Sequence, residues 1–267
     1  MSGPNAMGGM RRPPRLLRDL EVPRAMWEFG AYCASMPMGW FAPRGDGHGV
    51  LVLPGFLATD GSTGPLRAFL RRLGYDARPL LLGRNFGPTD AIVDGLPRRL
   101  SDLFTSTGRR VSLVGVSLGG IFARDLARSH AELVRQVITL ASPFRLPVRY
   151  TGPELTHAGP LYRAFTSRHS TRAAERPEED DLPPLSVPST AIYTRTDGVV
   201  PWWSCIEREG PASQSVEVWG SHSGLGHNPL ALAVVADRLA QPEGSWRPFR
   251  RDLVESLRMR TVGRSRR

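Results

Sequence analysis

Short apolar runs alternate with longer amphipathic segments along the chain from residue 49 onward. Mostly apolar runs predict strands at residues 49–54, 78–82, 109–115, 134–140, 189–194 and 216–219. Between them, apolar residues spaced three or four positions apart predict helices at residues 64–73, 89–104, 118–130 and 230–239. Because apolar strands that alternate with helices are typical of a parallel sheet, the pattern predicts an α/β fold: a mostly parallel sheet with helices on both faces.

Three stretches depart from this alternation and predict the domain organisation. Residues 144–188 are rich in proline and charged residues and poor in apolar ones, so they predict a small cap inserted before the fifth strand. Residues 1–44 predict a basic N-terminal extension with a packing helix, and residues 242–267 predict a basic tail. This leaves residues 45–241 as one folded domain that includes the cap.

The segment from Ala25 to Ala42 is rich in Met, Trp, Phe and Tyr, but Glu28 and Pro37 interrupt it. It is too short and too broken to cross a bilayer. Two interpretations therefore stay open, an amphipathic helix packed on the domain and a helix that lies on a membrane surface.

The composition supports a globular protein and directs attention to the ends of the chain. With 267 residues and 40% hydrophobic content, the chain can bury a large core, which excludes a fibrous or wholly disordered protein. The net charge is +10, and all 35 basic residues are Arg. Residues 1–24 hold five Arg and two acidic residues, and residues 250–267 hold seven Arg and two acidic residues, so the ends carry most of the excess.

No helix-turn-helix, zinc-ligand spacing or aromatic-interleaved basic stripe accompanies this charge, so no nucleic-acid partner is expected. Peripheral membrane contact through the basic or amphipathic ends is the alternative that the charge leaves open. The two cysteines, Cys33 and Cys205, do not make a disulfide framework. A reducing, cytoplasmic compartment is the simpler interpretation, and a single bridge between them stays open.

A candidate nucleophile lies where an apolar strand passes into an amphipathic helix. The segment Gly115-Val-Ser117-Leu-Gly119 matches the pattern G-x-S-x-G. The chain must turn sharply there, and glycines two residues on either side of Ser117 allow the strand and helix backbones to approach each other. Such a turn holds the serine hydroxyl above the helix N-terminus, whose dipole favours a developing negative charge.

A serine hydroxyl is a weak nucleophile without a base, so a histidine and an orienting carboxylate should follow it in the chain. Asp197 lies in a turn just past the strand at residues 189–194, where such a carboxylate is expected. After Asp197 only His222 and His227 remain. His222 follows directly on the last strand and is the predicted base, whereas His227 abuts the closing helix and is the alternative.

An acyl-transfer site also needs two backbone N–H groups that bind the developing oxyanion. Leu118, the residue after the candidate nucleophile, is expected to supply one of them. The loop after the first strand, Pro54-Gly55-Phe56-Leu57, is expected to supply the other through Phe56, with Leu57 as the near alternative.

Four segments together resemble the α/β-hydrolase superfamily, specifically its bacterial lipase- and esterase-like members, over about residues 45–240. These segments are Pro54-Gly-Phe56, Gly115-Val-Ser117-Leu-Gly119-Gly120, Thr196-Asp197-Gly-Val-Val-Pro201 and Gly220-Ser-His222-Ser-Gly-Leu225. The resemblance implies a Ser–His–Asp triad that hydrolyses carboxylic esters through an acyl-enzyme, with no cofactor and no metal. Many members have His-Gly before the oxyanion loop, where this chain has Pro54-Gly55.

Other activities stay open on the same residues. An acyltransferase or a thioesterase would use the same triad, and a non-catalytic binding protein could have the same fold. Three arginines of the predicted cap, Arg163, Arg168 and Arg172, could attract an anionic leaving group such as a CoA thioester, or could pair with neighbouring acidic residues. The expected partner is therefore a small acyl ester or lipid substrate, of a chain length that the sequence does not specify.

Overall fold

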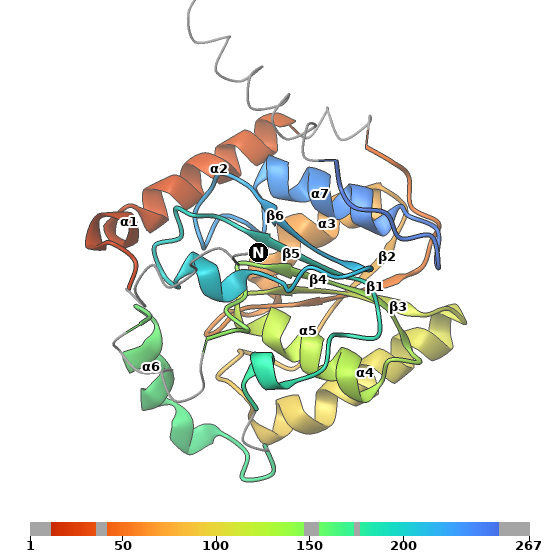
Figure 1. Cartoon of the computed structure of the whole chain (residues 1–267), viewed down its shortest axis with the longest axis horizontal. Helices are drawn as coiled ribbons and strands as arrows, with labels where there is room; N and C mark the ends of the chain where they lie inside the picture. The colour runs from red at the N-terminus through yellow and green to blue at the C-terminus, as the bar shows by residue number, and fades with distance from the viewer. Residues whose placement is uncertain (1–11, 36–41, 147–154, 174–176, 251–267) are drawn as a thin grey trace, which may run out of the picture.

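The computed structural model of the protein describes residues 12–35, 42–146, 155–173 and 177–250. In this part of the chain one sheet is formed by β1 (Gly49–Leu53), β2 (Asp76–Pro79), β3 (Val111–Val116), β4 (Val134–Leu140), β5 (Ser189–Tyr193) and β6 (Ser213–Glu217). Its strand order is β2-β1-β3-β4-β5-β6, and every neighbouring pair is parallel (Figure 1). The predicted α/β fold with a parallel sheet is therefore confirmed.

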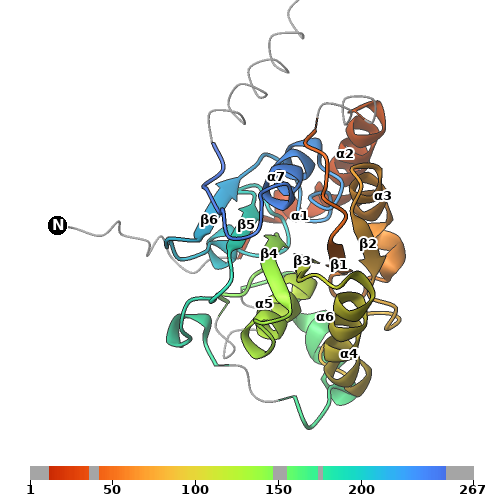
Figure 2. The same cartoon turned by 90° about the vertical axis from the view of Figure 1, so that its right-hand side faces the viewer.

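Helices cover both faces of the sheet, as Figure 2 shows. The longer ones are α2 (Glu21–Ser35), α3 (Gly64–Arg72), α4 (Asp90–Thr107), α5 (Leu118–Ser129) and α7 (Pro229–Leu239). The shorter ones are α1 (Arg15–Asp19), α6 (Gly159–Ala164) and the 3₁₀ helices Asp60–Thr63, Thr166–Arg168, Glu179–Asp181 and Trp202–Cys205.

Two buried clusters hold these layers together, one on each face of the sheet. Val50 and Val52 of β1 join α3 and α7 in one cluster, whereas Leu51 and Leu53 join α4 and α5 in the other. Successive side chains of a strand point to opposite faces, so a run that is apolar at every position serves both layers. This explains why the central strands are the easiest elements to recognise in the sequence.

The second strand begins and ends earlier than predicted, at Asp76–Pro79 instead of residues 78–82. The carboxylate of Asp60 accepts hydrogen bonds from the backbone N–H groups of Leu80 and Leu81, at 2.8 and 3.0 Å. Leu81 also has a left-handed backbone, with φ 60°, a conformation that leucine rarely adopts. These two amides therefore do not extend the ladder with β1.

The last strand also begins earlier than predicted, at Ser213–Glu217 instead of residues 216–219. Its first residues are polar because β6 is an edge strand and packs fewer side chains into the core. Gln214 is nevertheless buried, and its side-chain amide exchanges two hydrogen bonds with the backbone of Phe249, at 3.1 and 2.6 Å. The first part of the predicted tail, residues 242–250, thus packs on the domain, and residues 251–267 lie outside the described residues.

The described part of the predicted cap, residues 144–146, 155–173 and 177–188, holds α6 and two of the 3₁₀ helices. Arg124 of α5, only 1% exposed, forms ion pairs with Glu179 of the cap and with Glu207. A buried cation needs such partners because its desolvation is costly. The ion pairs therefore tie the cap to the layer that carries α5.

The N-terminal segment forms α1 and α2, and α2 packs on α7. Cys33 on α2 and Cys205 are both free thiols, so the single bridge that the sequence left open does not form. Among the described residues, no helix has both the length and the apolar character that crossing a bilayer requires.

Candidate active site

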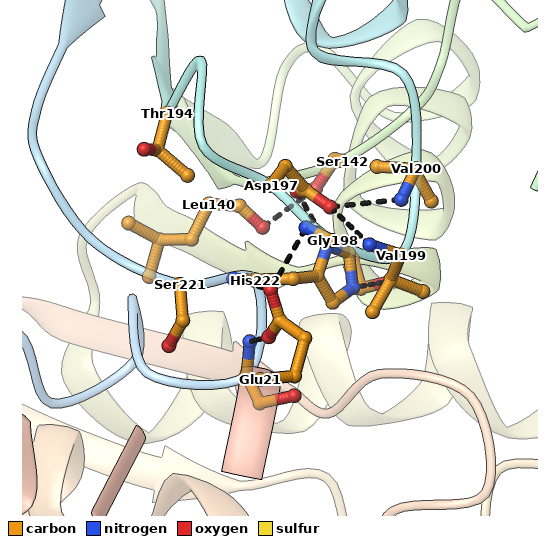
Figure 3. Close-up of polar contacts among 12 residues, drawn as sticks. Glu21, Leu140, Ser142, Thr194, Asp197, Gly198, Val199, Val200, Ser221 and His222 are labelled. Carbon is orange, nitrogen blue, oxygen red and sulfur yellow. Dashed lines mark hydrogen bonds and ion pairs between the residues drawn. The ribbon is translucent and has the colours of Figure 1, made fainter. Parts of the chain in front are cut away.

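Ser117, Asp197 and His222 follow β3, β5 and β6 and therefore meet at the carboxyl edge of the sheet. The His222 Nε2 atom lies 3.0 Å from Ser117 Oγ, and its Nδ1 atom lies 2.7 Å from Asp197 Oδ2. Figure 3 shows Asp197 and His222 facing each other. When Nδ1–H donates to Asp197, Nε2 presents a lone pair to the serine hydroxyl, which is the arrangement a general base needs.

The alternative histidine lies elsewhere. His227 Nε2 is 3.0 Å from the backbone oxygen of Ala25, and its ring packs edge-on against Phe29. His227 thus helps to seat α2 on the domain. Of the two histidines that the sequence offered, the structure brings His222 to Ser117.

The backbone at Ser117 is held in a conformation that L residues rarely adopt, with φ 50° and ψ −121°. The flanking glycines make this turn sterically feasible. A Cβ atom on Gly119 would lie 2.4 Å from the backbone oxygen of Leu53, and one on Gly115 would lie 2.3 Å from Gly120 Cα. Strain of this kind persists where the surrounding structure enforces it, and here it points the hydroxyl away from the strand.

Both oxygens of the Asp197 carboxylate are used. Asp197 Oδ1 accepts hydrogen bonds from the backbone N–H groups of Val199 and Val200, both at 2.8 Å, and Oδ2 faces His222 (Figure 3). The Asp197 side chain is 2% exposed. The carboxylate is therefore fixed in the orientation that directs it at the imidazole.

The electrostatic surroundings of His222 favour its protonated form. Burial by itself lowers the pKa of the imidazole because it disfavours the charged ring. The Asp197 carboxylate, and to a lesser extent that of Glu21, act in the opposite direction and prevail, so the pKa of His222 is raised above its usual 6.5. An imidazole with a raised pKa is a stronger base once it is deprotonated.

The two candidate oxyanion donors after β1 are in different situations. The Leu57 N–H donates to the backbone oxygen of Asn85 at 2.7 Å, whereas no acceptor for the Phe56 N–H is found among the described residues. The loop lies against the serine, since a Cβ atom on Gly55 would be 3.2 Å from Ser117 Cβ. Leu118 is the first residue of α5, where backbone N–H groups have no acceptor within the helix.

Asn85 is a contributor to this loop that sequence reasoning missed. It is 1% exposed, and its side-chain amide donates to the backbone oxygen of Pro54 at 2.9 Å. Its backbone N–H also donates to the oxygen of Ala58 at 2.9 Å. Together with the hydrogen bond from Leu57, these contacts fix the loop on both sides of Phe56, at Pro54 and at Ala58. No local pattern around Asn85 signals this role.

Two buried carboxylates of α2 were also missed. Glu21 accepts hydrogen bonds from the backbone N–H groups of Gly198, His222 and Ser223, at 2.8, 3.2 and 3.1 Å. It therefore bridges the loop that carries Asp197 and the loop that carries His222 (Figure 3). Arg24 pairs with Glu21 and donates to the backbone oxygen of Thr196 at 2.8 Å, which adds a second link to the acid loop.

Glu28, seven residues further along α2, holds the same histidine loop. It accepts from the Ser221 N–H and from the Asn228 side-chain amide, both at 2.7 Å. Gly224 has to be a glycine because a Cβ atom there would lie 2.5 Å from the Glu28 carboxylate. The signal in the sequence was the spacing of Glu21 and Glu28, since residues seven apart share one face of a helix.

A cavity of about 550 Å³ opens at Ser117 and extends along α5. Its walls come from α4, α5 and the cap, and they are mostly apolar. The lining includes Phe56, Ile92, Val93, Leu96, Ser117, Leu118, Ile121, Phe122, Leu126, Leu146, Tyr162 and Leu182. The cap arginine Arg172 points its charge elsewhere, since it pairs with Asp90 and Asp94 at 2.9 Å.

A second serine–histidine–aspartate set lies at the opposite edge of the sheet. His48 Nδ1 contacts Asp46, and its Nε2 lies 2.8 Å from Ser112 Oγ. His48 and Ser112 are both fully buried, and neither lines the cavity at Ser117. Burial, together with the nearby Arg135 charge, lowers the pKa of His48 in spite of Asp46. Access to a cavity therefore distinguishes the Ser117 set from this structural cluster.

No protein-family model matches the chain, and no curated protein matches it in sequence. Solved structures do match in fold. Lipase B of Aspergillus fumigatus is 18% identical over 78% of this chain, with a TM-score of 0.56, and this chain spans 56% of that lipase. A pyrethroid hydrolase is 20% identical, with a TM-score of 0.54, and the match covers 73% of this chain and 99% of that one.

Est1E from Butyrivibrio proteoclasticus is 13% identical, with a TM-score of 0.52, over 74% of this chain and 89% of that one. At these identities the likeness concerns the fold. The parallel sheet, its helical layers and these structural neighbours agree. The chain has the fold of the α/β-hydrolase superfamily.

Proposed function

We propose that this protein is a serine hydrolase that cleaves carboxylic esters, with Ser117 as the nucleophile, His222 as the base and Asp197 as the orienting carboxylate. The observation that carries the proposal is the position of the His222 ring, 3.0 Å from Ser117 Oγ and 2.7 Å from Asp197 Oδ2. The raised pKa of His222 adds to it, because a more basic imidazole accepts the serine proton more readily.

In the first half of the reaction, Ser117 Oγ attacks the ester carbonyl carbon while His222 Nε2 takes the hydroxyl proton. The carbonyl oxygen becomes an oxyanion, which the Phe56 and Leu118 N–H groups stabilise. When the tetrahedral intermediate collapses, the bond to the alcohol oxygen breaks and His222 returns the proton to the leaving alcohol. Ser117 then carries the acyl group as an ester.

Water completes the cycle by the same steps. His222 takes a proton from the water as it attacks the acyl carbon, and the second intermediate expels the Ser117 alkoxide, which recovers its proton from His222. Asp197 stays ionised throughout and stabilises the imidazolium that forms twice in each cycle.

The apolar cavity supports an ester with an extended apolar acyl group as the substrate. Cavity-lining residues run from Leu118 to Ser129, the two ends of the 12-residue helix α5. At about 1.5 Å per residue, this stretch corresponds to roughly 16 Å of helix. A wall of that length suits an acyl chain of medium or greater length better than an acetyl group.

The test is labelling with a fluorophosphonate probe, followed by mapping of the modified peptide by mass spectrometry. An adduct on Ser117, absent from a folded Ser117→Ala variant, is the expected result. His222→Ala should abolish labelling and turnover of p-nitrophenyl esters, whereas His227→Ala should retain both. An unlabelled Ser117 in the folded wild-type protein would contradict the proposal and favour a binding role for the fold.

A further inference from the structure

The helix α2 is oriented opposite to a typical amphipathic surface helix. Its buried residues are Glu21, Glu28 and Tyr32, and the two carboxylates bind backbone N–H groups of the domain. Among its exposed positions there is no charged side chain. Met26 and Trp27, in contrast, are 70% and 65% exposed. The helix is therefore anchored by polar contacts and turns its apolar side chains to the solvent.

These side chains form one surface together with neighbouring residues. We define the α1–α2 apolar face by its members Leu16, Leu20, Val22, Met26, Trp27 and Trp219. Trp27 and Trp219 pack edge to face, with ring centroids 6.4 Å apart, so residues from α2 and from the loop after β6 are in contact. Leu20, Trp27 and Trp219 also line one shallow hollow. Apolar patches of this kind on a protein surface mark interaction sites.

From these observations we propose that the α1–α2 apolar face docks on an anionic lipid surface. Aliphatic side chains beside tryptophans are the composition of helices that lie at the membrane interface, where the indole ring is buried and its N–H stays hydrated. The charge of the chain fits the same partner. Arg15 is exposed on α1, next to Leu16, and Arg18 is exposed there in an ion pair with Asp19. The whole chain has a net charge of +10.

The charge also decides between a lipid surface and a second copy of the chain. Two copies that met through this face would bring two molecules of charge +10 together, which opposes association. Anionic headgroups attract the same charge, with each arginine near the surface adding to the affinity. The apolar face would supply the insertion, and the arginines the attraction over a longer distance.

Docking through this face would bring the cap close to the lipid. The helices α1 and α6 lie at the same edge of the molecule (Figure 1). Arg12 donates to the backbone oxygen of Thr156 at 3.3 Å, and Thr156 lines the cavity above Ser117. Leu161 of α6, 48% exposed, adds an apolar side chain at this edge. The proposal concerns binding alone and does not depend on ester hydrolysis.

The experiment is flotation of the full chain with vesicles of phosphatidylcholine that contain about one third phosphatidylglycerol. The double variant Met26→Gln/Trp27→Gln keeps good helix formers at exposed positions, so α2 should fold, and the loss of the Trp27–Trp219 contact should lower the Tm only slightly. We expect the wild-type protein to float and the double variant to bind the vesicles at least about tenfold more weakly. The matched control is Leu81→Gln, which removes a leucine that is 62% exposed and follows β2.

Leu81→Gln should float as the wild type does, and vesicles of phosphatidylcholine alone should bind the wild type more weakly. Three results would overturn the proposal. In the first, the wild type does not bind the vesicles. In the second, the double variant floats as well as the wild type, which would assign binding to the arginine-rich ends. In the third, the wild type does not float, and light scattering shows that it is a dimer while the double variant is a monomer, which would assign the face to self-association.

Discussion

The carboxylate of Glu21 offers the sharpest test of how α2 affects His222, the proposed catalytic base. Glu21 accepts hydrogen bonds from Gly198, His222 and Ser223, so one side chain of α2 holds both loops of the proposed triad. Glu21→Gln keeps the length of the side chain and one acceptor oxygen. It removes the negative charge and places an NH₂ group where the second oxygen was.

The loss of stability follows from the hydrogen bonds. Glu21 Oε1 accepts from Gly198, His222 and the Arg24 guanidinium, and Oε2 accepts from Ser223. If the glutamine oxygen keeps the three bonds of Oε1, its NH₂ group faces the Ser223 N–H. One buried hydrogen bond is then lost, together with the charge of the Arg24 ion pair, at a cost of about 1–3 kcal/mol. Because each kcal/mol lowers the Tm of a domain of this size by roughly 2–4 °C, we expect a fall of about 2–12 °C.

The effect on the histidine has a definite sign. The charge of Glu21 is one of the causes that raise the pKa of His222, so its removal lowers that pKa. The proposed base works only when the imidazole is neutral, and the acidic limb of kcat/KM reports this ionisation in the free enzyme. Glu21→Gln should therefore shift the acidic limb to lower pH.

The assay is kcat/KM for a p-nitrophenyl ester as a function of pH, with Tm measured on the same preparations. Glu28→Gln is the matched control, because Glu28 is buried in the same helix and binds Ser221, but its charge is not among the causes of the His222 shift. The control should lose stability and keep its acidic limb. An unmoved limb in folded Glu21→Gln, or an equal shift in Glu28→Gln, would refute the reasoning.

Three further predictions follow from other parts of the structure. Val93→Trp fills the cavity from α4, so kcat/KM should fall more for long-chain than for short-chain esters, and an equal loss on both would contradict the assignment of the cavity. Arg124→Met leaves Glu207 without its buried ion-pair partner, while Glu179 keeps Arg128, and urea unfolding should show a loss of about 3–5 kcal/mol; a loss under 1 kcal/mol would contradict it. Folding lowers the pKa of His48 below 6.5, so the unfolded chain binds the proton at a higher pH than the folded protein does. The contribution of His48 to stability is therefore present above pH 6.5 and is lost as the pH falls through the pKa of the folded protein. Between pH 7.5 and 5.5, urea unfolding should therefore show a smaller loss of stability in His48→Gln than in the wild type, and equal losses would count against this sign.

Much of the fold follows from local patterns in the sequence. The mostly apolar strands β1, β3 and β4 are recognisable because both faces of each strand are buried, and the helices between them repeat their apolar residues with the period of an α-helix. The turn at Ser117 is recognisable because the glycines it needs lie within two residues of the serine. The edge strands β2 and β6 were misplaced by two or three residues, since their ends depend on Asp60 and on pairing with β5 rather than on apolar residues.

The sequence by itself determined the order of the elements, the candidate nucleophile and the loops where an acid and a histidine should lie, because parallel strands end at one edge of the sheet. Only the tertiary structure decided among the alternatives. His222 rather than His227 reaches Ser117, and the Leu57 N–H is occupied by Asn85. The same holds for α2, whose carboxylate at Glu21 binds residues about 180–200 positions away in the chain. Such contacts join segments that are brought together only by folding. The spacing of Glu21 and Glu28 places both carboxylates on one face of α2, but it does not reveal that this face points inward and the apolar face outward.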